Sequence, residues 1–87
     1  MKLSDVPIIS KDITSRLTED KALVVSVNRV KGYILENLAF DVWKSINNCS
    51  TVKEIISLCS KKKNINKHKI IQTLKDLEKF KLIYFKY

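Results

Sequence analysis

The amino-acid sequence predicts an α+β fold in which three short antiparallel strands precede three helices. Two observations lead to this prediction. Up to Leu35, β-branched residues gather in short runs that are separated by polar turns. From Leu38 onward, apolar residues recur at the three- and four-residue spacing of helices. With 87 residues, one glycine and one proline, the chain has the length and composition of a single small folded domain.

The three predicted strands have short connections. A polar turn at residues 19–21 separates the first two strands, and a break at residues 28–32, which contains the only glycine, precedes the third. Sequential strands with short connections predict an antiparallel meander. The strands are expected at residues 13–17, 23–27 and 33–35.

The first predicted helix has an apolar stripe that contains Trp43, which we therefore assign to the core. Asn47 and Asn48 are expected to end this helix, because asparagine tolerates the left-handed conformation found at helix ends. The other members of the stripe are Leu38, Ala39, Val42 and Ile46.

Capping residues mark the second and third helices. Thr51 and Glu54 have the spacing of a capping box, and the lysines of residues 61–63 are suited to a helix C-terminus. Asn66 is a candidate cap for a third helix that ends near Phe80. Its apolar residues are Ile70, Ile71, Leu74 and Leu77, and residues 82–85 follow as a last turn or a short strand.

The ends of the chain indicate its organisation. Residues 1–11 are polar and contain Pro7, so we expect a flexible arm ahead of one domain at residues 12–87. The sequence has no apolar stretch with the features of a signal peptide or a membrane span, which predicts a cytoplasmic protein.

The sequence offers no set of convergent groups for catalysis, so we expect a binding protein and not an enzyme. Cys49, Cys59 and His68 are too few and too scattered for structural zinc, and no cofactor or metal is expected. Both cysteines are interpreted as thiols packed as small apolar residues.

The positive charge lies mainly in the second half of the chain. Residues 1–36 carry six basic and five acidic side chains, whereas residues 37–87 carry eleven basic and four acidic ones. Such a field attracts an anionic partner. Lysine accounts for fifteen of the seventeen basic residues, a pattern that an AT-rich genome also produces on any protein surface. Both interpretations stay open at this point.

An edge of the predicted sheet is a candidate binding site. Edge strands present unpaired N–H and C=O groups, which can bind an extended peptide as an additional strand. In the third strand Tyr33 follows Gly32, and with Ile34 directed inward Tyr33 and Leu35 would face the other side. Tyr33 is therefore a candidate contact residue, with a purely structural role as the alternative.

From Gly32 to Trp43 the sequence resembles the coenzyme PQQ synthesis protein D family. These PqqD-like domains are the peptide recognition elements of ribosomally synthesised and modified peptides in bacteria. The resemblance covers about residues 12–83, with two departures from the family pattern, Glu36 in place of an asparagine and Lys81 in place of a glycine. The matching positions are Gly32, Tyr33, Leu35, Ala39, Val42, Trp43, Thr51, Val52, Glu54, Ile55, Leu74, Leu77, Leu82 and Ile83.

The resemblance implies a winged helix-turn-helix fold and a function. Such domains capture the leader segment of a precursor peptide and present the peptide to a modifying enzyme, for example a radical SAM protein or a leader peptidase. The leader would add to the third strand and lie in a groove formed with the third helix. Carried onto this chain, the peptide-binding residues are Lys31, Gly32, Tyr33, Ile34 and Leu35 of the strand, and Lys67, Ile71, Lys75 and Glu78 of the helix.

The competing interpretation is a winged-helix protein that binds DNA through its lysine-rich half. Reading of bases favours arginine on the recognition helix, whereas the two arginines here, Arg16 and Arg29, lie in the strand region. Lysines of the third helix would then contact phosphates without sequence preference. An adaptor that binds another protein is a further alternative. Among partners, a second copy of this chain in a homodimer also stays open.

Overall fold

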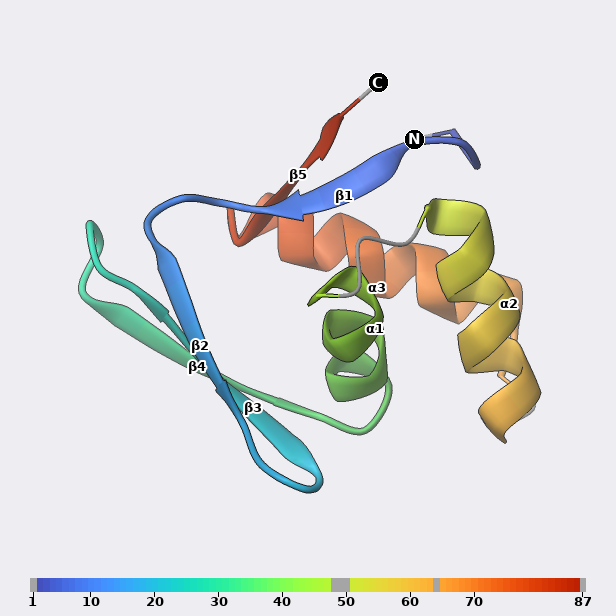
Figure 1. Ribbon diagram of the computed structural model, residues 1–87, viewed down its shortest axis with the longest axis horizontal. Coiled ribbons are helices and arrows are strands. Elements are labelled where there is room, and N and C mark those ends of the chain that lie inside the picture. Colours follow the sequence, from blue (N-terminus) through green and yellow to red (C-terminus); the bar gives the residue numbers. More distant parts are fainter. Residues whose placement is uncertain (1, 48–50, 64, 87) are drawn as a thin grey trace.

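The computed structural model of the chain describes residues 2–47, 51–63 and 65–86, without the side chains of residues 62 and 63. A three-stranded antiparallel sheet lies beside three helices, and a two-stranded ribbon crosses next to α3 (Figure 1). The predicted α+β class, with three antiparallel strands ahead of three helices, is confirmed. The elements are β1 (Val6–Ile9), β2 (Ile13–Leu17), β3 (Lys21–Ser26), β4 (Lys31–Glu36), α1 (Asn37–Asn47), α2 (Val52–Lys63), α3 (Lys67–Lys79) and β5 (Ile83–Lys86).

The three-stranded sheet has the strand order β2-β3-β4, so β2 and β4 are its two edges. The β2–β3 turn at residues 18–20 is closed by Thr18, whose N–H donates to the carbonyl oxygen of Lys21 at 2.8 Å. Along β3, Ala22 and Val24 are fully buried against the helices, while Leu23 and Val25 are exposed on the outer face. This period of two is what a strand produces when one of its faces covers a core.

The N-terminal segment differs from the flexible arm that the sequence analysis expected. Val6–Ile9 form the strand β1, which pairs antiparallel with β5, and Pro7 is fully buried opposite Phe85. Asp5 is also buried, and its carbonyl oxygen accepts from the N–H of Val52 at 2.9 Å. β5 resolves the open assignment of residues 82–85 in favour of a strand.

The helices bury the predicted stripes around Trp43, which is fully buried as expected. Ile55 of α2 and Leu74 of α3 are buried in the same core, and so is Cys59. Asn48 and Cys49 lie outside the described residues, so the expectations for them stay open.

Both predicted caps are present. Thr51 donates its N–H to Glu54 Oε1 at 3.0 Å, and the N–H of Glu54 donates to Thr51 Oγ1 at 3.2 Å, which completes the capping box. At the start of α3, Asn66 Oδ1 accepts from the N–H of His68 at 2.8 Å. Among the described residues, no helix is both long enough and apolar enough to cross a membrane.

The chain leaves α3 through a tight turn at Lys81, which has a φ of 60°. The N–H of Lys81 donates to the carbonyl oxygen of Glu78 at 2.9 Å, and the N–H of Leu82 donates to that of Leu77 at 3.0 Å. A residue in the left-handed conformation at this point is a common helix ending, which glycine adopts at the lowest cost.

Candidate functional site

The hydrogen bonding of β3 determines which backbone groups of β4 remain open. Thr18 bonds to Lys21 at one end of the β2–β3 pair, and Val27 donates to Asp12 at the other end, at 2.9 Å. Residue pairs of an antiparallel ladder alternate between bonded and non-bonded pairs. In the observed register Leu23 therefore bonds to β2, and the residues that bond to β4 are Ala22, Val24 and Ser26.

The same alternation continues across β4. Ala22, Val24 and Ser26 are opposite Leu35, Tyr33 and Lys31, so these three residues of β4 direct their N–H and C=O groups toward β3. The intervening Gly32, Ile34 and Glu36 direct theirs toward the open edge. An additional strand would find these groups as its donors and acceptors.

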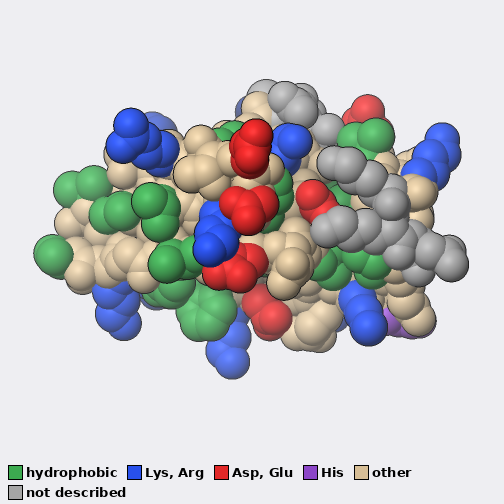
Figure 2. Space-filling model, turned by 90° about the horizontal axis from the view of Figure 1, so that it is seen from below, with side chains coloured by type: hydrophobic (Ala, Val, Ile, Leu, Met, Phe, Trp, Pro, Cys, Tyr) green, Lys and Arg blue, Asp and Glu red, His purple; other side chains and the backbone are tan. Residues whose placement is uncertain are grey.

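The side chains of β4 face two different environments. Leu35 is buried and Tyr33 is half-buried on the side of the helices, whereas Ile34 is 62% exposed on the outer face. This is the reverse of the inward orientation of Ile34 that the sequence analysis considered. Ile34 lies there next to the exposed Leu23. Figure 2 shows hydrophobic side chains gathered on the part of the surface that the sheet occupies.

A groove of about 330 Å³ lies between β4 and α3. Leu35, Leu77 and Leu82 are buried and form its apolar floor. Its remaining lining residues are Tyr33, Ile34, Ala39, Thr73, Asp76 and Phe80.

One end of the groove is closed by aromatic and polar contacts. The rings of Tyr33 and Phe80 are 5.6 Å apart between centroids, tilted by 40°. Next to them, Arg29 Nη1 donates to the carbonyl oxygen of Phe80 at 3.4 Å. These contacts connect the strand region to the end of α3. β4 therefore combines open backbone groups with an apolar recess.

The helix wall of the groove is not the one that the sequence analysis expected. Thr73, Asp76, Leu77 and Phe80 have the spacing of one flank of a helix, and this flank faces β4. No signal in the local sequence pattern separates this flank from the opposite one, because both border the buried stripe of Ile70, Leu74 and Leu77.

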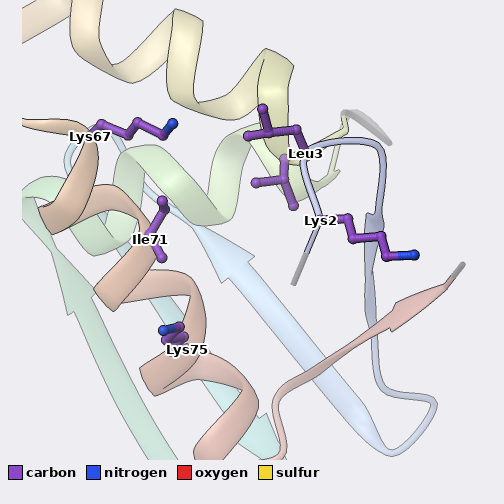
Figure 3. Close-up of a pocket in the computed structure, with 6 residues that line it drawn as sticks. Lys2, Leu3, Lys67, Ile71 and Lys75 are labelled. Carbon is purple, nitrogen blue, oxygen red and sulfur yellow. The ribbon is translucent and has the colours of Figure 1, made fainter.

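The four expected helix residues lie elsewhere. Lys67, Ile71 and Lys75 are on the opposite flank of α3, where they line a second pocket together with Lys2, Leu3 and Val52 (Figure 3). Glu78 is exposed and lines neither pocket. The structure thus brings Tyr33, Ile34 and Leu35 to the groove, and places the expected helix residues away from it.

The groove is nearly uncharged. Asp76 is its one carboxylate, and Gln72 Nε2 donates to Asp76 Oδ1 at 3.0 Å. At the far end of β4, Glu36 is 3.9 Å from Lys21 Nζ. Within the described residues no group of three or more His, Cys, Asp or Glu side chains could hold a metal ion. The groove is therefore suited to apolar side chains of a ligand.

Comparisons with known proteins bear on the fold. No known family and no curated protein matches the sequence. A solved structure described as TbiB1 in complex with the TbiA(beta) leader peptide superimposes with a TM-score of 0.79. The match covers 87% of this chain and 93% of that chain, at 14% sequence identity. At this identity the comparison establishes that the two chains share a fold, and the protein of known structure is one that was solved with a leader peptide.

Proposed function

We propose that this protein is a non-catalytic module that captures the leader segment of a ribosomally synthesised precursor peptide. The observation that carries the proposal is the open edge of β4 beside the apolar groove. Gly32 and Ile34 offer backbone groups at this edge, and Tyr33 and Phe80 border the adjoining recess. The shared fold with TbiB1, solved with a leader peptide, supports a peptide as the ligand.

The bound segment extends the sheet as a fourth strand next to β4. Backbone hydrogen bonds to Gly32, Ile34 and Glu36 supply affinity without regard to sequence, as in other cases of strand addition. Side chains of a strand alternate between its two faces, so every second side chain of the ligand points toward α3. The fit of those side chains in the groove determines which peptide sequences bind.

The lining of the groove predicts which side chains are selected. Leu35, Leu77 and Leu82 are apolar and buried, so apolar ligand side chains gain the most from entering. Asp76 at the rim disfavours a neighbouring acidic side chain. Acidic residues of a leader are accordingly expected outside the groove.

The captured leader leaves the remainder of the precursor free to reach a modifying enzyme. In this arrangement the module supplies binding and orientation, and the enzyme supplies the chemistry. Holding a substrate close to a catalyst raises its effective concentration, which is a sufficient function for a protein of this size.

Titration of two ligands tests the proposal. The leader segment of a candidate precursor peptide, chosen from the gene neighbourhood, is titrated into the protein and followed by calorimetry, while a DNA duplex is tested by gel shift. We expect saturable binding of the precursor at low micromolar concentration or below, and DNA binding that disappears as salt rises. Tight, salt-resistant binding of DNA without binding of the precursor would favour the winged-helix DNA-binding alternative.

A further inference from the structure

The second pocket lies on the flank of α3 that faces away from β4. It has a volume of about 340 Å³ and is bordered by Leu3 of the N-terminal segment, Val52 of α2 and Ile71 of α3. Figure 3 shows Leu3 facing α3, with Lys67 and Lys75 on either side of Ile71. Three separate parts of the chain thus contribute to one recess.

The N-terminal wall of this pocket is held in place by backbone hydrogen bonds. The carbonyl oxygen of Leu3 accepts from the N–H of Lys53 at 3.0 Å, and that of Asp5 accepts from Val52 at 2.9 Å. Asp5 also accepts from the N–H of Lys2 through Oδ2, at 2.7 Å. The wall is therefore part of the folded structure and keeps Leu3 opposite α3.

The chemistry of the pocket combines apolar surface with unpaired positive charge. Val52 is buried at its floor, Ile71 is half-buried, and Leu3 remains 46% exposed. Lys67 and Lys75 are exposed, and neither forms an ion pair with a carboxylate in the part of the chain that the structure describes. None of the described residues that line the recess is acidic.

We propose that this pocket binds a short acidic segment of a second protein, in which a carboxylate adjoins an aliphatic side chain. The aliphatic group covers Leu3 and Ile71, and the carboxylate accepts hydrogen bonds from Lys67 and Lys75. A recess of this size holds about two side chains of such a segment. Charge complementarity thus specifies the occupant.

The position of the pocket separates its occupant from the peptide in the groove. The buried stripe of Ile70, Leu74 and Leu77 lies between the two flanks of α3. A helix with its side chains is about 10–12 Å across. A strand lying along β4 would have to leave the groove and cross α3 to reach Ile71. We assign the acidic segment to another polypeptide because α3 separates the pocket from the strand-addition site, and the two have no lining residue in common.

Amide NMR spectra of the isotope-labelled protein test this inference. The probe is the capped peptide Gly-Leu-Glu-Leu-Glu-Gly, and its control has glutamine in place of both glutamates. We expect the acidic probe to shift the amide signals of Leu3, Val52 and Ile71, and the glutamine peptide to leave them in place. The double variant Lys67→Gln/Lys75→Gln should weaken binding of the acidic probe by about fivefold, as expected for two exposed ion pairs.

A matched variant controls for net charge. Lys69→Gln/Lys79→Gln removes the same charge from α3 at positions that line neither pocket, and it should bind the probe as the wild type does. Equal weakening in both double variants would mean that only the general field attracts the probe, and would overturn the proposal. The proposal would also be overturned if millimolar acidic probe left the signals of Leu3, Val52 and Ile71 unchanged. The same holds if a DNA duplex, and not the acidic probe, shifted these signals.

A third arm identifies the source of the segment. The precursor peptide alone should shift Gly32 and Ile34, and the acidic probe added afterwards should still shift Leu3 and Ile71. If the precursor alone shifts both sets of signals, the pocket belongs to the leader and the second-protein assignment is wrong. If the precursor shifts neither set while the acidic probe binds, peptide capture at β4 fails and the pocket stands.

Discussion

The rings of Tyr33 and Phe80 contact each other at 5.6 Å across the gap between β4 and the end of α3. Tyr33 is half-buried and Phe80 is 47% exposed, so the contact lies at the surface and not in the core. The two rings border the groove between β4 and α3, whose floor is apolar. Aromatic side chains are enriched in protein interfaces, so the pair is a candidate contact for a peptide ligand.

Phe80→Ala is predicted to weaken peptide binding at β4 by about tenfold, or 1.4 kcal/mol. The substitution removes one border of the groove and the ring contact with Tyr33, while the fold loses only about 0.5–1.5 kcal/mol. Calorimetric titration with the precursor peptide measures the change. Tyr84→Ala is the matched control, because Tyr84 is an aromatic residue of similar exposure that lines neither pocket. Equal losses in both variants would contradict the assignment of Phe80.

Ile34→Pro is predicted to abolish measurable binding while the domain stays folded. The N–H of Ile34 points toward the open edge, so proline removes a donor that a ligand uses and no bond of the β3–β4 ladder. Tyr33→Pro is the contrasting variant, since it removes a ladder bond and should unfold the domain at moderate temperature. Thermal unfolding by circular dichroism, together with peptide titration, separates the two effects. Normal binding by a folded Ile34→Pro protein would exclude strand addition at this edge.

Leu74→Ala is predicted to lower the free energy of unfolding by about 2–5 kcal/mol, because the side chain of Leu74 is fully buried where α3 packs on the core. In a domain of this size that loss approaches the total stability. Ile71→Ala, at the half-buried flank of the same helix, should cost distinctly less. Urea unfolding of both variants checks the order, and the reverse order would mean that the stripe is misassigned.

Local patterns in the sequence predicted the caps and the stripes correctly. The Thr51–Glu54 box and the Asn66 cap involve residues within three positions of one another, so the physics that forms them is visible in the sequence. The burial of Trp43 was predicted in the same way, from the three- and four-residue spacing of apolar residues in α1. Such features depend on no contact with a distant part of the chain.

Two features depend on distant contacts and were not predictable. β1 contains Pro7, which argues against a strand, and it forms only because β5 pairs with it from the other end of the chain. The sequence analysis placed the helix wall on the flank of α3 that does not line the groove, because the buried stripe of this helix has two equivalent borders. Which of them faces β4 depends on how the helix docks, and this leaves Lys67, Ile71 and Lys75 away from the groove and Thr73, Asp76 and Phe80 within it.

Acidification is predicted to remove the part of the capping-box stabilisation that depends on the ionised carboxylate of Glu54. The hydrogen bond from the backbone N–H of Thr51 lowers the pKa of Glu54, and the Thr51 hydroxyl lowers that pKa further. A carboxylate with a lowered folded-state pKa stabilises the protein fully above its unfolded pKa, and the benefit is lost as the pH falls through the folded value. The difference in unfolding free energy between wild type and Glu54→Gln should therefore be largest at neutral pH and shrink below the ordinary glutamate range.

Urea unfolding at a series of pH values measures this difference. Thr51→Ala removes the other half of the box, which should cost about 0.5–2 kcal/mol at neutral pH and reduce the same pH-dependent part. A gap between wild type and Glu54→Gln that stays constant down to strongly acidic pH would show that the ionised form of Glu54 contributes nothing.

Lys81→Gly is predicted to stabilise the domain by about 0.5–1 kcal/mol. Lys81 has a φ of 60°, and this left-handed conformation costs a residue with a Cβ about 1–2 kcal/mol. Glycine removes that cost. Part of this gain is offset, because ordering the more flexible glycine on folding costs about 0.5–1 kcal/mol more.

Lys75→Gly is the matched control for this prediction. The same substitution in the middle of α3 should destabilise the domain by about 0.5–1 kcal/mol, because glycine is unfavourable inside a helix and no left-handed residue is relieved there. Both side chains are exposed lysines, so the loss of charge is the same in the two variants. Opposite signs of the change in melting temperature would establish that the backbone conformation at Lys81, and not the lysine side chain, limits stability at the end of α3. A loss of stability in both variants would show that the turn after α3 does not hold Lys81 in the left-handed region.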